Sequence, residues 1–190
     1  IFDNNDRPGI MLSSAIKKYA DYYGVICGKK NVFFTNNDTA YESAISLFKK
    51  GINVQAIIDI REKSDSSIIK QTENLGIKIY WSHAVVNTYG YKKLKQISIM
   101  KLSKDGQSVV DSITNIDCDC LGMAGGWTPA VHLFTQSGGK LKFRDEDQVF
   151  IPSEYPSKQI SIGSCNGDFE LDVLIKNSSN SLKKFLEIKK

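Results

Sequence analysis

The pattern of apolar and polar positions between residues 31 and 59 predicts a strand, a helix and a second strand. Residues 32–34 are all apolar and form the centre of the first strand. The helix carries apolar residues at helical spacing along one face, namely Ala40, Ala44, Leu47 and Phe48. Gly51 supplies the expected stop signal, and an acidic residue, Asp59, closes the second strand. These features together predict a βαβ unit.

The turn between the first strand and the helix matches only part of the glycine pattern of dinucleotide-binding βαβ units. Thr35, Asn37 and Ala40 occupy the three positions of G-x-G-x-x-G/A. Ala40 is small enough for helix and strand to pack closely, whereas glycines at the other two positions let a pyrophosphate approach the backbone. Asn tolerates a left-handed turn, so the loop can still form.

Two interpretations of this turn stay open. In the first, Thr35, Asn36, Asn37 and Asp59 form a nucleotide site, in which the amides of residues 36–38 face a phosphate and Asp59 accepts ribose hydroxyls. In the second, the site is vestigial, and the Thr and Asn side chains fill the space of the phosphate.

The flanking sequence extends this unit into a larger α/β domain. An apolar stripe of Leu12, Ile16 and Tyr19 predicts an amphipathic helix at 10–23. A short helix at 64–76 and a strand at 77–81 follow, and the strand extends the same sheet. Short strands between about 84 and 116 predict an antiparallel meander. We therefore expect a Rossmann-like parallel sheet with an inserted antiparallel β-meander.

The last third of the chain has a weaker pattern. Residues 118–129 predict a strand that runs into Gly125 and Gly126, and ISIG at 160–163 predicts another short strand. Asp168 is the expected cap of a final amphipathic helix, whose apolar residues are Phe169, Leu174, Leu182 and Phe185.

Composition excludes several classes of protein. With 190 residues, of which 41% are hydrophobic, the chain can bury a real core. No signal peptide is visible in the sequence and no apolar run is long enough to span a membrane, so we expect a cytoplasmic protein. The net charge of +4 comes mainly from lysine, since the arginines are Arg7, Arg61 and Arg144 alone. Because arginine is favoured in nucleic-acid recognition, we expect no nucleic-acid partner.

The reactive side chains do not form a familiar catalytic or metal motif. The cysteines, which include no C-x-x-C pair, are Cys27, Cys118, Cys120 and Cys165. They do not combine with His83 and His132 at zinc-site spacing, so we predict no metal and no redox disulfide. Cys118 and Cys120 alternate with aspartates and are expected to face one way. Neither histidine has a carboxylate or nucleophile near it in sequence, and we predict no catalytic residue.

Four separated stretches resemble the alpha subunit of heterotetrameric bacterial sarcosine oxidase. They are NNDRPGIML, FTNNDTAY, GGWTPAVHLFTQSGGKL and IGSCNGDFELD. The order of elements also resembles that of flavoproteins with two dinucleotide-binding domains, such as thioredoxin reductase, in which the second nucleotide domain is inserted into the first. The chain begins at Ile1 rather than Met, and we expect it to be a fragment.

The resemblance implies a domain plan, cofactors and partners. Residues 1–28 and 117–190 would belong to the first nucleotide-binding domain, and residues 29–116 to the inserted second one. NAD would be carried by the alpha subunit, FAD and FMN elsewhere in the complex, and tetrahydrofolate by a C-terminal domain beyond Lys190. The implied partners are the beta, gamma and delta subunits, and a homodimer of the fragment is a further possibility.

The resemblance also implies where cofactor contacts lie. Gly125 and Gly126 follow the strand that leads back to the first domain, and Gly163 and Ser164 stand where flavin-binding relatives have Gly-Asp. Loss of that carboxylate argues against a conventional FAD site, and the first domain's glycine loop would precede Ile1. The implied function is a portion of a complex that oxidises sarcosine to glycine with transfer to folate, inactive by itself. The alternatives are an NAD(P)H-dependent oxidoreductase domain and a non-catalytic nucleotide-binding module.

Overall fold

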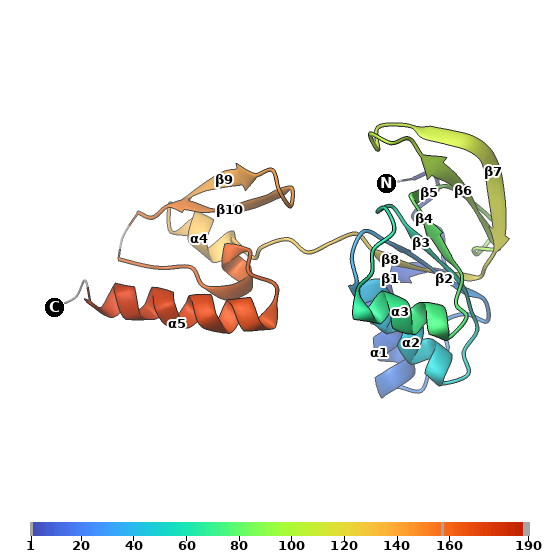
Figure 1. Cartoon of the computed structure of the whole chain (residues 1–190), viewed down its shortest axis with the longest axis horizontal. Helices are drawn as coiled ribbons and strands as arrows, with labels where there is room; N and C mark the ends of the chain where they lie inside the picture. Colours follow the sequence, from blue (N-terminus) through green and yellow to red (C-terminus); the bar gives the residue numbers. More distant parts are fainter. Residues whose placement is uncertain (1, 157, 188–190) are drawn as a thin grey trace. The chain divides into compact units, whose positions relative to one another are not determined.

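The computed structural model describes residues 2–156 and 158–187 and divides the chain into two compact units, 1–126 and 127–190 (Figure 1). The first unit contains a five-stranded sheet in the order β1-β8-β2-β3-β4, and each neighbouring pair is parallel. Its strands are β1 (Ile10–Leu12), β8 (Cys120–Ala124), β2 (Asn31–Thr35), β3 (Val54–Asp59) and β4 (Ile79–Trp81). The parallel pairing of β2 with β3 confirms the predicted βαβ unit.

Each face of the parallel sheet is covered by a different layer (Figure 1). Helices lie on one face, namely α1 (Ser13–Tyr22), α2 (Thr39–Lys49) and α3 (Ser67–Asn74). On the other face lies an antiparallel sheet of β5 (His83–Tyr89), β6 (Gln96–Leu102) and β7 (Val109–Asp117). The predicted fold class, including the meander, is confirmed.

The central strand β2 shows why a continuous apolar run suits this fold. Val32 packs in the core between the two sheets, and Phe33 packs in the core between the parallel sheet and the helices. Both side chains are fully buried. A parallel strand that is covered on both faces needs apolar residues at consecutive positions. Gly122 of β8 lies directly beneath the ring of Phe33 and leaves room for it.

The helix predicted at 10–23 begins later than predicted, so the prediction is wrong for its first turn. Ile10–Leu12 form strand β1, which pairs with β8, and α1 begins only at Ser13. This later start moves the buried face to Ser13, Ile16 and Ala20, so that Leu12 is exposed. Pairing with a strand more than a hundred residues away is not visible in local periodicity.

The two neighbouring cysteines do not face one way as predicted. Cys118 packs in the core between the two sheets, whereas Cys120 packs in the core beneath the helices. The alternation breaks because β7 ends at Asp117 and β8 begins at Cys120. Burial raises the pKa of each thiol to about 12, which suits structural cysteines.

The second unit is built from α4 (His132–Gln136), β9 (Lys140–Arg144), β10 (Val149–Glu154), the 3-10 turn η1 (Gly163–Asn166) and α5 (Leu171–Glu187). Its buried apolar residues include Phe134, Val149 and Ile151. The predicted final helix is present but begins at Leu171, so Asp168 is not its cap and Phe169 lies outside it, contrary to the prediction. The predicted strand at 160–163 does not form. Gly163 has a φ of 72° and opens η1, which ends the extended segment before it can pair.

The division into units differs from the predicted three-part plan. Strands β1 and β8 share one sheet with β2 and β3, so residues 1–28 pack in the same unit as the predicted inserted domain. Whether these segments correspond to parts of two nucleotide domains in a longer protein stays a prediction, as does a homodimer.

Candidate functional site

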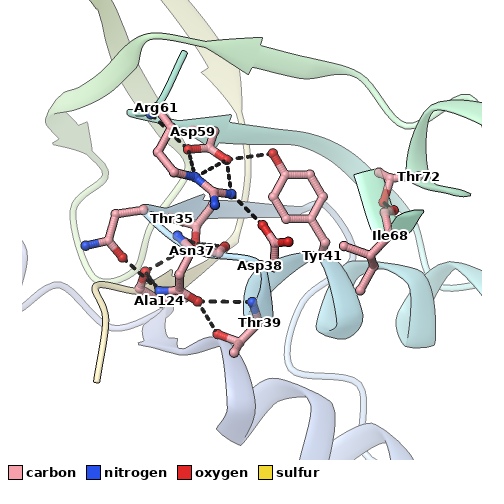
Figure 2. Close-up of polar contacts among 11 residues, drawn as sticks. Thr35, Asn37, Asp38, Thr39, Tyr41, Asp59, Arg61, Ile68, Thr72 and Ala124 are labelled. Carbon is pink, nitrogen blue, oxygen red and sulfur yellow. Dashed lines mark hydrogen bonds and ion pairs between the residues drawn. The ribbon is translucent and has the colours of Figure 1, made fainter. Parts of the chain in front are cut away.

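The predicted site residues of the first unit meet at one edge of the parallel sheet. Strands β2, β3 and β8 end there with Thr35, Asp59 and Ala124, which pair across the sheet. Helix α2 starts from the same edge (Figure 2). Open α/β sheets bind their ligands at the carboxyl ends of the strands, so this is the expected location of a nucleotide site.

The backbone of the turn after β2 is hydrogen-bonded within the protein. The amide of Asn36 donates to the carbonyl oxygen of Ala124 over 3.3 Å. The amide of Asn37 donates to Thr35 Oγ1 over 3.0 Å, and the amide of Thr39 donates to Asn37 Oδ1, also over 3.0 Å. Figure 2 shows the Asn37 side chain at the start of α2, where it accepts a hydrogen bond from the backbone N–H of Thr39, the first residue of the helix.

The side chains of the turn connect it to the glycine pair after β8. Asn37 Nδ2 donates to the carbonyl oxygen of Ala124 over 3.0 Å and to Asn36 Oδ1 over 2.8 Å. Asn36 Nδ2 in turn donates to the carbonyl oxygen of Gly125 over 3.1 Å. A Cβ atom at Gly126 would lie 3.4 Å from the same Asn36 nitrogen. The structure therefore brings Asn36, Asn37, Gly125 and Gly126 together.

Asp59 is fully buried, and both of its carboxylate oxygens accept hydrogen bonds from protein groups. Oδ1 accepts from the backbone amide of Arg61 over 2.9 Å and from Arg61 Nε over 3.1 Å. Oδ2 accepts from the Tyr41 hydroxyl over 2.7 Å and from Arg61 Nη2 over 2.8 Å. Arg61 Nη2 also forms an ion pair with Asp38 over 2.8 Å. We call Asp38, Tyr41, Asp59 and Arg61 the carboxylate cluster (Figure 2).

The protonation states of Tyr41 and Arg61 follow from their contacts. Burial, together with the neighbouring Asp59, raises the pKa of Tyr41 well above its usual value, so that Tyr41 keeps its proton and donates. The hydrogen bonds to Asp59 raise the pKa of Arg61, which stays charged.

Tyr41 is expected to remain protonated in alkaline solution until the chain unfolds. Because its folded-state pKa is raised, its contribution to stability is complete below the unfolded pKa of about 10 and is lost as the pH rises above it. Phenolate absorbance during alkaline titration measures this. Tyr41→Phe should therefore leave the early part of the titration unchanged. Loss of early absorbance in Tyr41→Phe contradicts the prediction.

The other predicted residues lie in less informative settings. In the second unit, Gly163 opens η1 beside Leu174, and Ser164 is exposed. His83 Nδ1 lies 2.6 Å from the carbonyl oxygen of Trp81, and His132 is exposed at the start of α4. Within residues 2–156 and 158–187, no group of three or more His, Cys, Asp or Glu side chains is arranged to hold a metal ion. No helix in the same ranges is long and apolar enough to cross a membrane.

Sequence reasoning missed the arginine and the tyrosine of the carboxylate cluster. The available signal for Arg61 was its position two residues after Asp59, at the end of a strand. Tyr41 had no such signal, because it stands in the first turn of α2 among residues that were assigned to packing.

Comparison with solved structures places the chain among FAD/NAD(P)-binding oxidoreductase folds. Thioredoxin reductase of T. acidophilum superimposes with a TM-score of 0.63 and 15% identity, covering 100% of this chain and 62% of that one. L-proline dehydrogenase of P. horikoshii gives a TM-score of 0.50 and 21% identity, covering 86% of this chain and 27% of that one. At these identities the similarity concerns the fold alone.

Sequence comparison identifies a particular relative. The chain is 33% identical over 172 residues to sarcosine oxidase subunit alpha of Corynebacterium sp. strain P-1, covering 90% of this chain and 17% of that protein. It is 34% identical over 151 residues to the same subunit of Rhizobium meliloti strain 1021, covering 80% of this chain and 14% of that protein. No family model matches. The chain is therefore homologous to a region of the sarcosine oxidase alpha subunit, which confirms the predicted resemblance.

The fold implies a dinucleotide at the start of α2, but the contacts in this structure do not fit one. The amides of Asn36, Asn37 and Thr39 already donate to protein oxygens, and the carboxylate of Asp59 already accepts from Tyr41 and Arg61. A nucleotide-binding role was predicted for Thr35, Asn36, Asn37 and Asp59. It stays a prediction, and a binding measurement is needed to test it.

Proposed function

We propose that this chain is a nucleotide-domain portion of the alpha subunit of a flavin-dependent sarcosine oxidase complex. The observation that carries the proposal is the identity to sarcosine oxidase alpha subunits, which extends over 80% to 90% of the chain, in agreement with the fold. The complex oxidises the N-methyl amino acid sarcosine to glycine and transfers the released carbon to folate. Its other members are beta, gamma and delta subunits, and its location is the cytoplasm.

Within that complex the chain contributes scaffold rather than reacting groups. NAD belongs to the alpha subunit, FAD and FMN to other parts of the complex, and tetrahydrofolate to a separate domain of the alpha subunit. Gly125 and Gly126 are exposed at the strand edge of the first unit, which suits a contact with a nucleotide. Gly163 and Ser164 of the second unit are proposed cofactor contacts on the strength of the resemblance alone, with serine in the place of the relatives' aspartate. The chain alone is inactive.

A chimera tests the proposal. This chain replaces the matching region of the Corynebacterium sp. strain P-1 alpha subunit, and the chimera is co-expressed with the beta, gamma and delta subunits. We expect a co-purifying complex that oxidises sarcosine. The control carries instead the equivalent region of T. acidophilum thioredoxin reductase, which has the same fold but only 15% identity to this chain. Assembly and turnover no better than those of the control contradict the proposal.

A further inference from the structure

A dinucleotide requires two kinds of group at this edge of the sheet. Free backbone N–H groups at the start of the helix bind the pyrophosphate, and a free carboxylate at the end of the second strand binds the ribose hydroxyls. The chain has both kinds of group in the expected places, around Thr39 and at Asp59. The amide of Thr39 and the carboxylate of Asp59 are already paired with neighbouring side chains of the same chain.

At the pyrophosphate position the partner is Asn37. Its Oδ1 atom accepts hydrogen bonds from both the amide and the hydroxyl of Thr39, and this is the role of a phosphate oxygen at a helix start. Its Nδ2 atom is held by Ala124 and Asn36. An entering phosphate has to displace a side chain that is hydrogen-bonded at both ends, and these hydrogen bonds are then lost.

The charge at the helix start also disfavours a phosphate. Asp38 immediately precedes Thr39 and places a carboxylate there, where negative charge interacts favourably with the helix dipole. Asp38 and Asp59 share the single positive charge of Arg61, so these three side chains leave one net negative charge. A pyrophosphate brought to this position meets like charge in a partly buried setting.

At the ribose position the partner is Arg61. The carboxylate of Asp59 accepts five hydrogen bonds, two at Oδ1 and three at Oδ2, of which four come from Arg61 and one from Tyr41. A ribose hydroxyl has to displace the guanidinium from a fully buried carboxylate. Separating a buried ion pair is strongly unfavourable, because the remaining charge is left without a partner.

We infer that the dinucleotide crevice of this βαβ unit is filled by the chain's own side chains, with Asn37 in the place of the pyrophosphate and Arg61 in that of the adenosine ribose. The unit is then a structural module that carries no nucleotide at the start of α2. This inference concerns the βαβ unit itself and does not depend on the proposed role in a sarcosine oxidase.

Titration of the full chain with NAD, NADP and ADP-ribose tests the inference. Calorimetry measures affinity, and the amide NMR signals of residues 36–39 report binding at this turn rather than elsewhere. We expect no saturable shift of these signals at millimolar ligand. Saturable shifts with a sub-millimolar dissociation constant overturn the inference. The chimera experiment measures assembly and turnover, so failure of one test is distinguishable from failure of the other.

An opened variant tests which side chains close the crevice. Asn37→Gly combined with Asp38→Asn removes the internal acceptor and the carboxylate and leaves Arg61 in place. We expect ADP-ribose to bind at least tenfold more tightly than to the unsubstituted chain, with shifts in residues 36–39. The matched control is Asn74→Gly with Asp65→Asn, at exposed positions away from the turn. If the opened variant folds, as judged by its NMR spectrum, and gains no affinity over this control, the assignment of the closing residues is wrong.

Discussion

Replacing Arg61 with alanine is expected to lower the free energy of unfolding by about 3 kcal/mol. The side chain of Asp59 is 0% exposed, and the substitution removes its ion-pair partner while the carboxylate stays buried. The value lies at the low end of the range for broken buried pairs, because the Arg61 side chain is 32% exposed and water can partly replace it. Urea unfolding followed by circular dichroism measures the change.

Two comparisons identify the cause of this loss. Asp38→Asn removes the other partner of Arg61, whose side chain is 42% exposed, and is expected to cost less than about 1 kcal/mol. In an Asp59→Asn background, Arg61→Ala should cost much less than in the unsubstituted chain, since no buried charge then remains. Equal losses in Arg61→Ala and Asp38→Asn, or an unchanged cost in the Asp59→Asn background, contradict a role for the buried carboxylate.

The βαβ unit was predictable because its elements are specified locally. The apolar run at 32–34, the helical spacing after Ala40 and the stop at Gly51 are short-range signals, and they gave the correct elements at nearly the correct bounds. The meander was predictable for the same reason, since its strands are separated by turns at Gly90 and Gly106. Strand β1 was not, because three residues become a strand only through pairing with β8.

The candidate site was predictable in position but not in its contacts. Parallel strands end at one edge, so Thr35 and Asp59 had to lie near each other once the βαβ unit was recognised. Whether their polar atoms are free depends on side-chain directions, and these depend on tertiary packing. Arg61 turns back onto Asp59, and Asn37 turns onto Thr39, in ways that spacing does not specify. Both interpretations of the turn therefore remained open from the sequence. The contacts favour the vestigial site, in which side chains of the turn fill the space of the phosphate.

Replacing Gly122 with alanine is expected to lower the free energy of unfolding by about 2 kcal/mol, within the range for overpacked cores. A Cβ atom at this position would lie 2.5 Å from Phe33 Cδ1 and 3.1 Å from Ile16 Cδ1. Both side chains are buried in the core beneath the helices, so neither can move aside without disturbing its neighbours. Denaturant unfolding of the variant measures the loss.

Gly125→Ala is the matched control for Gly122→Ala. Gly125 directly follows β8, a Cβ atom there would contact nothing within 4 Å, and the substitution should change stability by less than about 0.5 kcal/mol. Phe33→Leu removes the ring from above Gly122, so in that background the cost of Gly122→Ala should fall by half or more because the two sites are coupled. If the cost is the same with phenylalanine and with leucine at position 33, the close approach of the Phe33 ring to the backbone of β8 is not what requires glycine there.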